Sequence, residues 1–536
     1  MKRCITLMLA GCLLFTGCSG ANKPEEVEPT TQKTEALKNE LKKSNKDTLN
    51  IGFVDGGISQ NPFEAKTKAS VNVLNLVYDG MFAIGSNGNL NNMLVESYVK
   101  NDDGKFQFIL RSGVTFHNGK AVTSDDIGYS IDLLKKSNTE GSSGQSVYAN
   151  AKDAITGFEK VDDRTFILSL KSTGITPLYT LVFPIVSGDG KFSGTGSYKI
   201  DKLTNDKIEL SFFEGGLVKN ANIKKIEAIR FASYKDMETS YKANKVDMVF
   251  TDQTNLGLFK YHRNTKTVQT RTNEFYYIAP NLRRGTMASL KKRQVLSYAI
   301  NRETVTSRAF DNFAVACDFP VPSDYFIYDT QIATYTYDVG TCISKLEDMG
   351  YALKKDGARE YLTKGSSKLS IKIIAPKHDM TQVNIAKSVA SDLSDIGVYT
   401  TVDLLESSDY NKQLSSGNYD MAIGKANIGT EFDLRFMFSG ANNINKVSSS
   451  NINSSLNTIA NEPYDLVKVK EGYEKLYEYL IKELPIISLC FANDTVVISD
   501  RLYNVTSGYN AYDMLSNITY YTFEKEETAD KTQVVD

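Results

Sequence analysis

The sequence contains no tryptophan and only three histidines among 536 residues, and these two shortages restrict the chemistry it can support. His117, His262 and His378 are scattered along the chain, and no Cys-x-x-Cys or His-Glu-x-x-His motif accompanies them, so a zinc site is not expected. No Gly-x-Ser-x-Gly motif provides the nucleophile of a hydrolase. We therefore predict no catalytic residues, no metal ligands and no cofactor.

The charge balance excludes another class of function. The formal net charge is −2, which gives no electrostatic reason to expect nucleic-acid binding.

The chain has 30 tyrosines and 26 phenylalanines, so tyrosine would have to supply any flat aromatic surface in a binding cleft. With 41% hydrophobic residues, a chain of this length can bury a large core in two or three lobes.

The N-terminus has the pattern of a secretory signal. Two basic residues precede the apolar run Ile5–Phe15, which is too short to be a permanent membrane span. Small residues before Cys18 resemble a bacterial lipobox, so we predict a signal peptide over 1–17 and lipidation of Cys18. Cys12 has a closer consensus but would leave an apolar core of only about six residues. Residues 18–47 are polar and lack aromatics, as expected of a disordered tether.

The remaining cysteines allow one disulfide. Cys317 and Cys342 could pair in an oxidising exterior, or both could be free. Cys490 lies in an apolar run and is expected to be a buried free thiol.

The most informative stretch runs from Val95 to Tyr129. Its residues predict a turn at Asp102–Lys105, a half-buried strand over Phe106–Leu110, and a helix from Thr123 or Ser124 through Leu134. A threonine or serine cap followed by two aspartates suits the positive end of a helix.

This stretch resembles the extracytoplasmic solute-binding proteins of peptide and nickel ABC importers, known as family 5. Three further runs support the resemblance: the GTGSYKI run at Gly194–Ile200, the amphipathic block Leu290–Arg302, and the segment Gly417–Gly424. The resemblance implies an α/β protein with the two-lobe periplasmic-binding-protein fold, of the large class II type, with an extra subdomain in lobe one.

Local patterns predict several other elements. Leu369–Ala375, Thr381–Ile396 and Val398–Leu404 form a β-α-β unit, which implies a parallel strand pair. A helix is expected over Val71–Phe82, and another over Tyr473–Pro485.

The resemblance also implies a domain organisation with two crossing segments, near Tyr277–Arg283 and Leu489–Asp494. Lobe one comprises 48–283 plus 491–536, with its subdomain at about 63–182, and lobe two comprises 284–490.

The family's ligand-pairing strand corresponds here to Ile423–Asn427, so the implied binding residues include Gly424, Lys425, Ala426 and Asn427. Lys425 replaces the usual tryptophan, and the family's amine-binding aspartate is missing. The nearest carboxylates are Glu431, which we include as a candidate, and Asp433. The other candidate ligand contacts are Tyr276, Tyr277 and Asn281 beside the crossing, and Gln60 and Asn61 in the first loop.

The resulting hypothesis is a monomeric receptor, anchored by lipid to the outer face of the cytoplasmic membrane or lying in a periplasm. It would hand a peptide or similar small solute to the permease subunits of an ABC importer. Two alternatives remain open at this point: a receptor for nickel or another metal chelate, and a peptide-sensing lipoprotein without transport.

Overall fold

The computed structural model describes residues 47–137, 148–172, 174, 176–252, 255–260, 265–329, 331–429, 433–462 and 465–523. The predicted signal peptide, the lipidation site Cys18, the tether up to residue 46 and the candidate Glu431 lie outside the described residues. Among the helices of the described part, none is both long and apolar enough to span a membrane.

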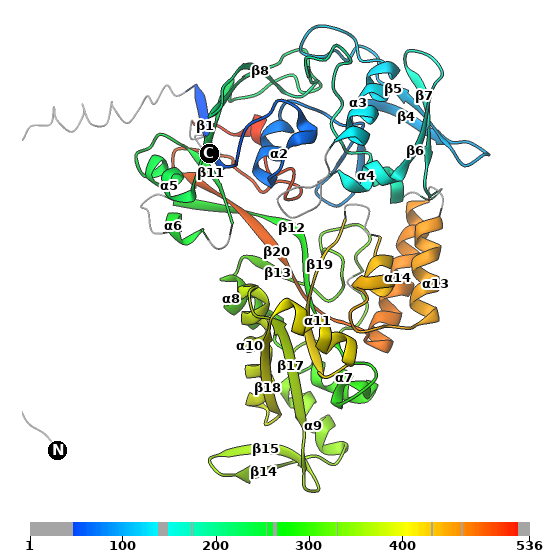
Figure 1. Cartoon of the computed structure of the whole chain (residues 1–536), viewed down its shortest axis with the longest axis vertical. Coiled ribbons are helices and arrows are strands. Elements are labelled where there is room, and N and C mark those ends of the chain that lie inside the picture. The colour runs from blue at the N-terminus through cyan, green and yellow to red at the C-terminus, as the bar shows by residue number, and fades with distance from the viewer. Residues whose placement is uncertain are drawn as a thin grey trace, which may run out of the picture. The chain divides into compact units, whose positions relative to one another are not determined.

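The largest sheet has eleven strands and contains two long strands at its centre (Figure 1). In spatial order the strands are β18 (Tyr399–Leu405), β17 (Ser370–Pro376), β19 (Met421–Asn427), β12 (Thr265–Pro280), β20 (Ile487–Ser499), β11 (Met248–Thr251), β1 (Thr48–Val54), β10 (Lys225–Phe231), β9 (Lys207–Phe212) and β8 (Tyr198–Leu203), while β13 (Ala314–Ala316) also pairs with β20.

Strands β12 and β20 are antiparallel partners from Thr265 opposite Ser499 to Ile278 opposite Ile487. Their register shifts between Arg271 and Phe275. On one side of this pair β1 lies parallel to β10 and β11, and on the other side β17 lies parallel to β18 and β19. Two parallel α/β groups therefore share a pair of long central strands.

Three smaller sheets complete the strand content. They comprise β4 (Val95–Lys100), β5 (Phe106–Leu110), β7 (Thr165–Leu170) and β6 (Ile155–Lys160) in one sheet, β2 (Phe82–Ile84) and β3 (Leu90–Asn92) in a second, and β14 (Ala352–Asp356), β15 (Arg359–Lys364) and β16 (Ser367–Lys368) in a third. The predicted turn at Asp102–Lys105 joins β4 to β5, and Gly104 takes a positive φ of 84° there.

The described helices are α2 (Lys68–Leu74), α3 (Ser124–Lys136), α4 (Ala149–Ala154), α5 (Tyr234–Lys242), α6 (Gly257–Lys260), α7 (Leu290–Ser297), α8 (Arg302–Phe310), α9 (Val339–Asp348), α10 (Met380–Asp395), α11 (Ser407–Ser416), α12 (Arg435–Phe438), α13 (Ser450–Asn461) and α14 (Leu466–Glu483). Helix α3 begins as predicted, because the Asp126 carboxylate accepts hydrogen bonds from the backbone N–H and hydroxyl of Thr123. The predicted β-α-β unit is confirmed as β17, α10 and β18.

The helix predicted over Val71–Phe82 is wrong beyond Leu74, where α2 ends. The chain instead turns, and the Tyr78 hydroxyl donates to the carbonyl oxygens of Gln60 and Phe192. Strand β2 then begins at Phe82. The apolar residues at helical spacing are buried in the core by this turn, so their periodicity alone was misleading.

Of the two outcomes that the sequence left open for Cys317 and Cys342, the structure shows the second, since both thiols are free and buried. They lie in different hydrophobic clusters, one packed around α14 and one around α10. Burial raises the pKa of the Cys342 thiol to about 12, so this group stays protonated at neutral pH. Cys490 is a buried free thiol, as predicted.

Candidate functional site

Strand β19 has one edge that is covered only at its beginning. β12 pairs with β19 along its whole length, whereas β17 pairs with it only at Met421 and Ala422. The Ile423 carbonyl oxygen, on the β17 side, accepts hydrogen bonds from Gln382 Nε2 at 2.7 Å and Tyr410 Oη at 2.8 Å. Within the described part of the chain, no strand pairs with this edge beyond Ala422.

Alternation along the strand identifies the backbone groups at this free edge. The Ile428 N–H donates to the Asn273 carbonyl on the β12 side, while the Ile423 carbonyl faces the opposite side. Backbone groups alternate between the two edges of an antiparallel strand. The N–H and C=O of Lys425 and Asn427 therefore point to the free edge, where an added extended chain could pair with them.

Gly424 is required by a close approach of Tyr277. A Cβ at Gly424 would lie 2.4 Å from Tyr277 Cζ, so any side chain would displace the ring. Tyr277 is 4% exposed and stacks on Phe275, with ring centroids 5.4 Å apart. Ala426 is also buried. Tyr277 and Ala426 are thus core residues in this structure, and only the backbone of this strand segment and the Lys425 and Asn427 side chains are accessible.

Four charged side chains of alternating sign form a chain across the central strands. Lys68 Nζ, in the first turn of α2, lies 2.7 Å from Asp494 Oδ2 on β20 and 3.6 Å from Glu274 Oε1 on β12. The other Glu274 oxygen lies 3.0 Å from Lys425 Nζ on β19. We call these four residues the charge chain; it links α2, β20, β12 and β19.

The pKa values of the charge chain reflect a balance of burial and pairing. Burial alone would raise the pKa of the Glu274 carboxyl, but Lys68 and Lys425 outweigh it and hold this pKa below its usual value. Burial would likewise lower the pKa of the Lys68 ammonium, but Asp494 and Glu274 raise it instead. Asp494 is the exception, because burial raises its pKa despite Lys68.

Tyr276 supports the charge chain from the neighbouring position on β12. Its hydroxyl donates to Glu274 Oε2 at 3.4 Å, and Lys425 Nζ lies 5.4 Å from its ring centroid. The ring is 3% exposed and packs edge-on against Phe310. Tyr276 therefore positions Glu274 and Lys425 and does not present its own face.

The side-chain amide of Asn281 is used in hydrogen bonds within the protein. It is 1% exposed, and its Nδ2 donates to the carbonyl oxygens of Gly417 and Tyr419. Its Oδ1 accepts the backbone N–H groups of Arg283 and Arg284. The side chain closes the turn after β12, which accounts for its burial.

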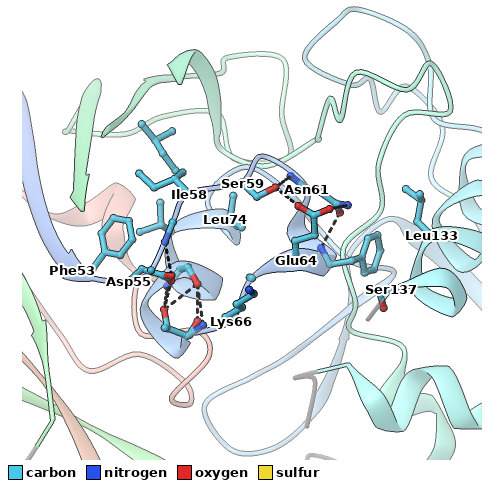
Figure 2. A pocket seen from close by; sticks show the side chains of 18 of the residues that line it. Phe53, Asp55, Ile58, Ser59, Asn61, Glu64, Lys66, Leu74, Leu133 and Ser137 are labelled. Carbon is cyan, nitrogen blue, oxygen red and sulfur yellow. Dashed lines mark hydrogen bonds between the residues drawn. The ribbon is translucent and has the colours of Figure 1, made fainter. Parts of the chain in front are cut away.

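The loop between β1 and α2 is held by its own polar side chains (Figure 2). Asp55 accepts hydrogen bonds from the Gly57 N–H and the Thr67 hydroxyl. Glu64 accepts from the Ser59 hydroxyl at 2.6 Å and from Asn61 Nδ2 at 3.2 Å. Gln60 and Asn61 therefore belong to the loop between β1 and α2, whereas Ile423–Asn427 belong to β19.

A cavity of about 810 Å³ lies behind this loop at the carboxyl end of β1. Phe53, Phe63, Leu74 and Ile208 form apolar parts of its wall, and Asn61 lines it as well. Ligands of parallel α/β sheets bind at the carboxyl ends of strands, so this position suits a binding cavity. Lys66 and Thr67 line this cavity, and the next residue along the chain, Lys68, belongs to the charge chain.

A second cavity, of about 390 Å³, contains two carboxyl groups from distant segments, Asp79 and Asp513. Among the described residues that line it there is no lysine, arginine or histidine. Burial raises the pKa of Asp79 to about 6, although the Thr195 hydroxyl donates to it. Burial, with Asp79 adding to it, raises the pKa of Asp513 to about 7.

The described residues contain no cluster of three or more histidine, cysteine or carboxylate side chains that could hold a metal ion. Sequence reasoning identified Lys425 and Tyr276 but missed Lys68, Glu274 and Asp494. No linear motif could have found them, because Lys68 and Asp494 are 426 residues apart and only the strand order brings them together.

Comparison with known proteins gives consistent results. Residues 89–446 match the family model of bacterial extracellular solute-binding proteins, family 5 (middle). The oligopeptide-binding protein AppA of Bacillus subtilis is 20% identical over 526 residues, covering 93% of this chain and 94% of AppA. Heme-binding protein A of Haemophilus influenzae is 24% identical over 430 residues, covering 72% of this chain and 75% of that protein.

A solved structure of a nickel ABC transporter protein from Bacillus halodurans superposes with a TM-score of 0.74 at 16% identity. The match covers 86% of this chain and 98% of that one. This likeness confirms the predicted periplasmic-binding-protein fold.

Proposed function

Because the chain belongs to the bacterial extracellular solute-binding proteins of family 5, we propose that it captures a peptide or similar small solute and delivers it to the permease of an ABC importer. Members of this family are extracytoplasmic transport receptors and not enzymes. In this proposal the protein acts as a monomer and is held at the membrane by a lipid on Cys18.

The observation that carries the proposal is the free edge of β19. Lys425 and Asn427 each offer one N–H and one C=O there, at the spacing that an extended peptide needs for pairing. A ligand held by its main chain is recognised independently of its side chains. This type of binding suits a receptor for many peptides and agrees with the peptide-binding relative AppA.

The charge chain supports a ligand that carries both charges. A peptide has an ammonium group at one end and a carboxylate at the other. Glu274 and Asp494 can pair with an amine, and Lys425 and Lys68 with a carboxylate, and Lys425 belongs to the strand that has the free edge. Lys425 is neutralised by Glu274 at 3.0 Å, so a ligand carboxylate would have to compete with this pair.

The ligand would lie between two lobes, 48–283 plus 491–536 and 284–490. In this proposal β12 and β20 are the crossing segments, and the shift of register between Arg271 and Phe275 is the place where they bend. Gln60 and Asn61 would approach the ligand from the first loop, while Gly424 and Ala426 would shape the strand that pairs with it. Glu431 remains a candidate outside the described residues.

A metal-chelate receptor is the second candidate, favoured by the likeness to the nickel transporter protein. The described residues offer no cluster of protein ligands for a bare ion, so such a receptor would have to bind the chelator. The same free strand edge and charge chain could bind an amino-acid chelator through its amine and carboxylate.

A backbone substitution at the free edge tests the proposal. Asn427→Pro removes one N–H that faces the free edge and leaves the bonds to β12 intact, because proline is tolerated at such positions. Asn427→Ala changes the same side chain but keeps the N–H. Native mass spectrometry and calorimetry with a mixed tripeptide library should show binding to the parent chain and to Asn427→Ala. Asn427→Pro should bind about tenfold more weakly, as expected for one lost hydrogen bond.

Equal affinity of both variants would remove the strand-pairing basis of the proposal. Retention of nickel-histidine with no retention of any peptide would favour the chelate receptor instead.

A further inference from the structure

The segment between β13 and α9 is fixed at its base to helix α14. The Phe319 ring stacks on Tyr477, with centroids 4.1 Å apart and an interplanar angle of 23°. The Tyr477 hydroxyl donates to the Ile327 carbonyl oxygen at 3.1 Å. Both contacts are buried, and all of these residues fall within the proposed lobe two. Whatever moves α14 therefore also moves this segment.

The tip of the same segment contacts an element of the proposed lobe one. The Phe326 N–H donates to the Asn87 carbonyl oxygen at 2.9 Å. The Tyr325 ring lies directly against Gly88, where a Cβ would be 2.3 Å from Tyr325 Cδ2. Asn87 and Gly88 form the turn between β2 and β3, and Gly88 takes a positive φ of 77° there. A glycine is required at this turn both for its backbone conformation and for the closeness of the ring.

The tip also contacts β12 at the place where its register with β20 shifts. The guanidinium carbon of Arg271 lies 4.5 Å from the Tyr325 ring centroid, and Arg271 Nε lies 3.3 Å from Asp324 Oδ1. The Arg271 side chain is only 9% exposed, whereas Asp324 is 58% exposed. The stack on Tyr325 is therefore the stronger of the two contacts, because solvent screens the ion pair.

We propose that residues Asp324–Phe326 are a latch that holds the two lobes together on the β2–β3 side, so that Tyr325 and Gly88 set how long a captured ligand is retained. This inference rests on the proposed function for its ligand, but its contacts exist without one. Tyr325 and Gly88 do not lie at the free edge of β19, where the ligand is proposed to bind. They act on the ligand indirectly, by holding the two lobes together.

The contacts have the strength expected of a reversible device. A main-chain hydrogen bond and a cation–π stack are both weak contacts, and together they can shift the balance between open and closed forms about tenfold, which is about 1.4 kcal/mol, without preventing opening. The latch should therefore act mainly on release. Capture occurs while the lobes are apart, so the association rate should be affected little.

Two glycines provide a matched test. Gly88→Ala adds a methyl group that collides with Tyr325, in a backbone with φ 77°. Gly113→Ala imposes the same kind of backbone strain, at φ 74°, but its Cβ would have no atom within 4 Å. Any difference between these variants reports the contact with Tyr325 and not the backbone strain.

Hydrogen–deuterium exchange of the ligand-free full chain is the first measurement. In Gly88→Ala, peptides covering Phe326 and the β2–β3 turn should exchange about tenfold faster, and the same peptides in Gly113→Ala should match the parent. Tyr325→Ala should behave like Gly88→Ala, while Tyr325→Phe, which keeps the ring on Arg271 and loses only the hydroxyl that hydrogen-bonds it, should exchange more slowly than Tyr325→Ala. Unchanged exchange in both Gly88→Ala and Tyr325→Ala would overturn the latch.

Release kinetics of trialanine provide the second measurement. Tyr325→Ala should release it about tenfold faster with an association rate unchanged within about twofold. A slower association with normal release would contradict the latch. If trialanine does not bind even the parent chain, the proposed ligand class fails, while the exchange experiment still decides the latch.

Discussion

Two places in this protein hold partly buried carboxylates, and the pKa of Glu274 at one of them shifts in the opposite direction from the pKa values of Asp79 and Asp513 at the other. At the central strands Glu274 and Asp494 are paired with Lys68, and Glu274 also with Lys425. In the 390 Å³ cavity, Asp79 and Asp513 have no basic side chain among the described lining residues. The pKa of Glu274, which has two lysine partners, is therefore held low, whereas burial raises the pKa of Asp494 despite Lys68. The pKa values of Asp79 and Asp513 are raised to about 6 and about 7.

The charge chain has lysine partners for its carboxylates, whereas the cavity that contains Asp79 and Asp513 has none among its described lining residues. In the proposed function, the groups of the charge chain would exchange one partner for another when a charged ligand enters, because their charges are already balanced in pairs. Asp79 and Asp513 carry protons in mildly acidic solution and act as buried polar groups. The first arrangement suits binding, and the second suits the packing of the C-terminal segment on α2, where Asn72 also bonds to Ala511.

The largest expected effect concerns the unpaired carboxyls. Their folded pKa values exceed the ordinary value of 3.8, so the folded state binds more protons, and stability must fall as pH rises from about 4 through 7. Asp79→Asn and Asp513→Asn should each remove on the order of 2 kcal/mol of this pH dependence. Urea unfolding at a series of pH values measures it, with the exposed-turn variant Asp102→Asn as the control.

Two results would contradict this prediction: a parent chain that is equally stable at pH 4 and pH 7, or two asparagine variants whose stability depends on pH as strongly as that of the parent. Either result would mean that folding does not raise the pKa values of Asp79 and Asp513. The contrast between the two sites would then disappear.

A smaller effect is expected from breaking the charge chain at its centre. Lys68→Met leaves Asp494 and Glu274 without their shared cation and should destabilise the protein by roughly 1 to 2 kcal/mol at pH 7. The loss should shrink near pH 4, because Asp494, whose pKa is raised, becomes protonated. Chemical denaturation of Lys68→Met at both pH values measures this, with Lys135→Met on the exposed side of α3 as the comparison.

An equal loss at both pH values would mean that Lys68 contributes through packing of its methylene groups and not through its charge.

The smallest effect concerns the outer end of the charge chain. Lys425 is 39% exposed, so Lys425→Met should cost only about 0.5 kcal/mol at low salt. In about 1 M NaCl the difference from the parent should vanish, since exposed pairs are screened. Unfolding at the two salt concentrations tests this. A cost that persists in high salt would place Lys425 with the buried groups.

Sequence patterns predicted elements that depend on neighbours along the chain. The turn at Asp102–Lys105, the capped start of α3 and the β17–α10–β18 unit were all predicted from local signals and are confirmed. The helix over Val71–Phe82 failed beyond Leu74, because contacts of Tyr78 with Gln60 and Phe192 override the local periodicity. The sequence left open whether Cys317 and Cys342 pair, because spacing along the chain does not determine distance in space.

Part of the candidate site was likewise predicted from the sequence, and part of it depended on the tertiary structure. The resemblance pointed to Gly424 and Lys425, whereas the roles of Tyr277 and Asn281 changed once their burial was known. Whether a tyrosine faces a ligand or the core depends on which neighbour covers it, and a single strand pattern does not contain that information.

By itself, the sequence determined the class of the protein: an α/β chain with motifs that identify its family and without the catalytic or metal-binding motifs sought. Only the tertiary structure decided which edge of β19 remains free, which lysine neutralises Glu274, and that Tyr325 packs on Gly88. The physical reason is that these features join residues separated by up to 426 positions, and strand order and packing, which emerge only on folding, set those distances.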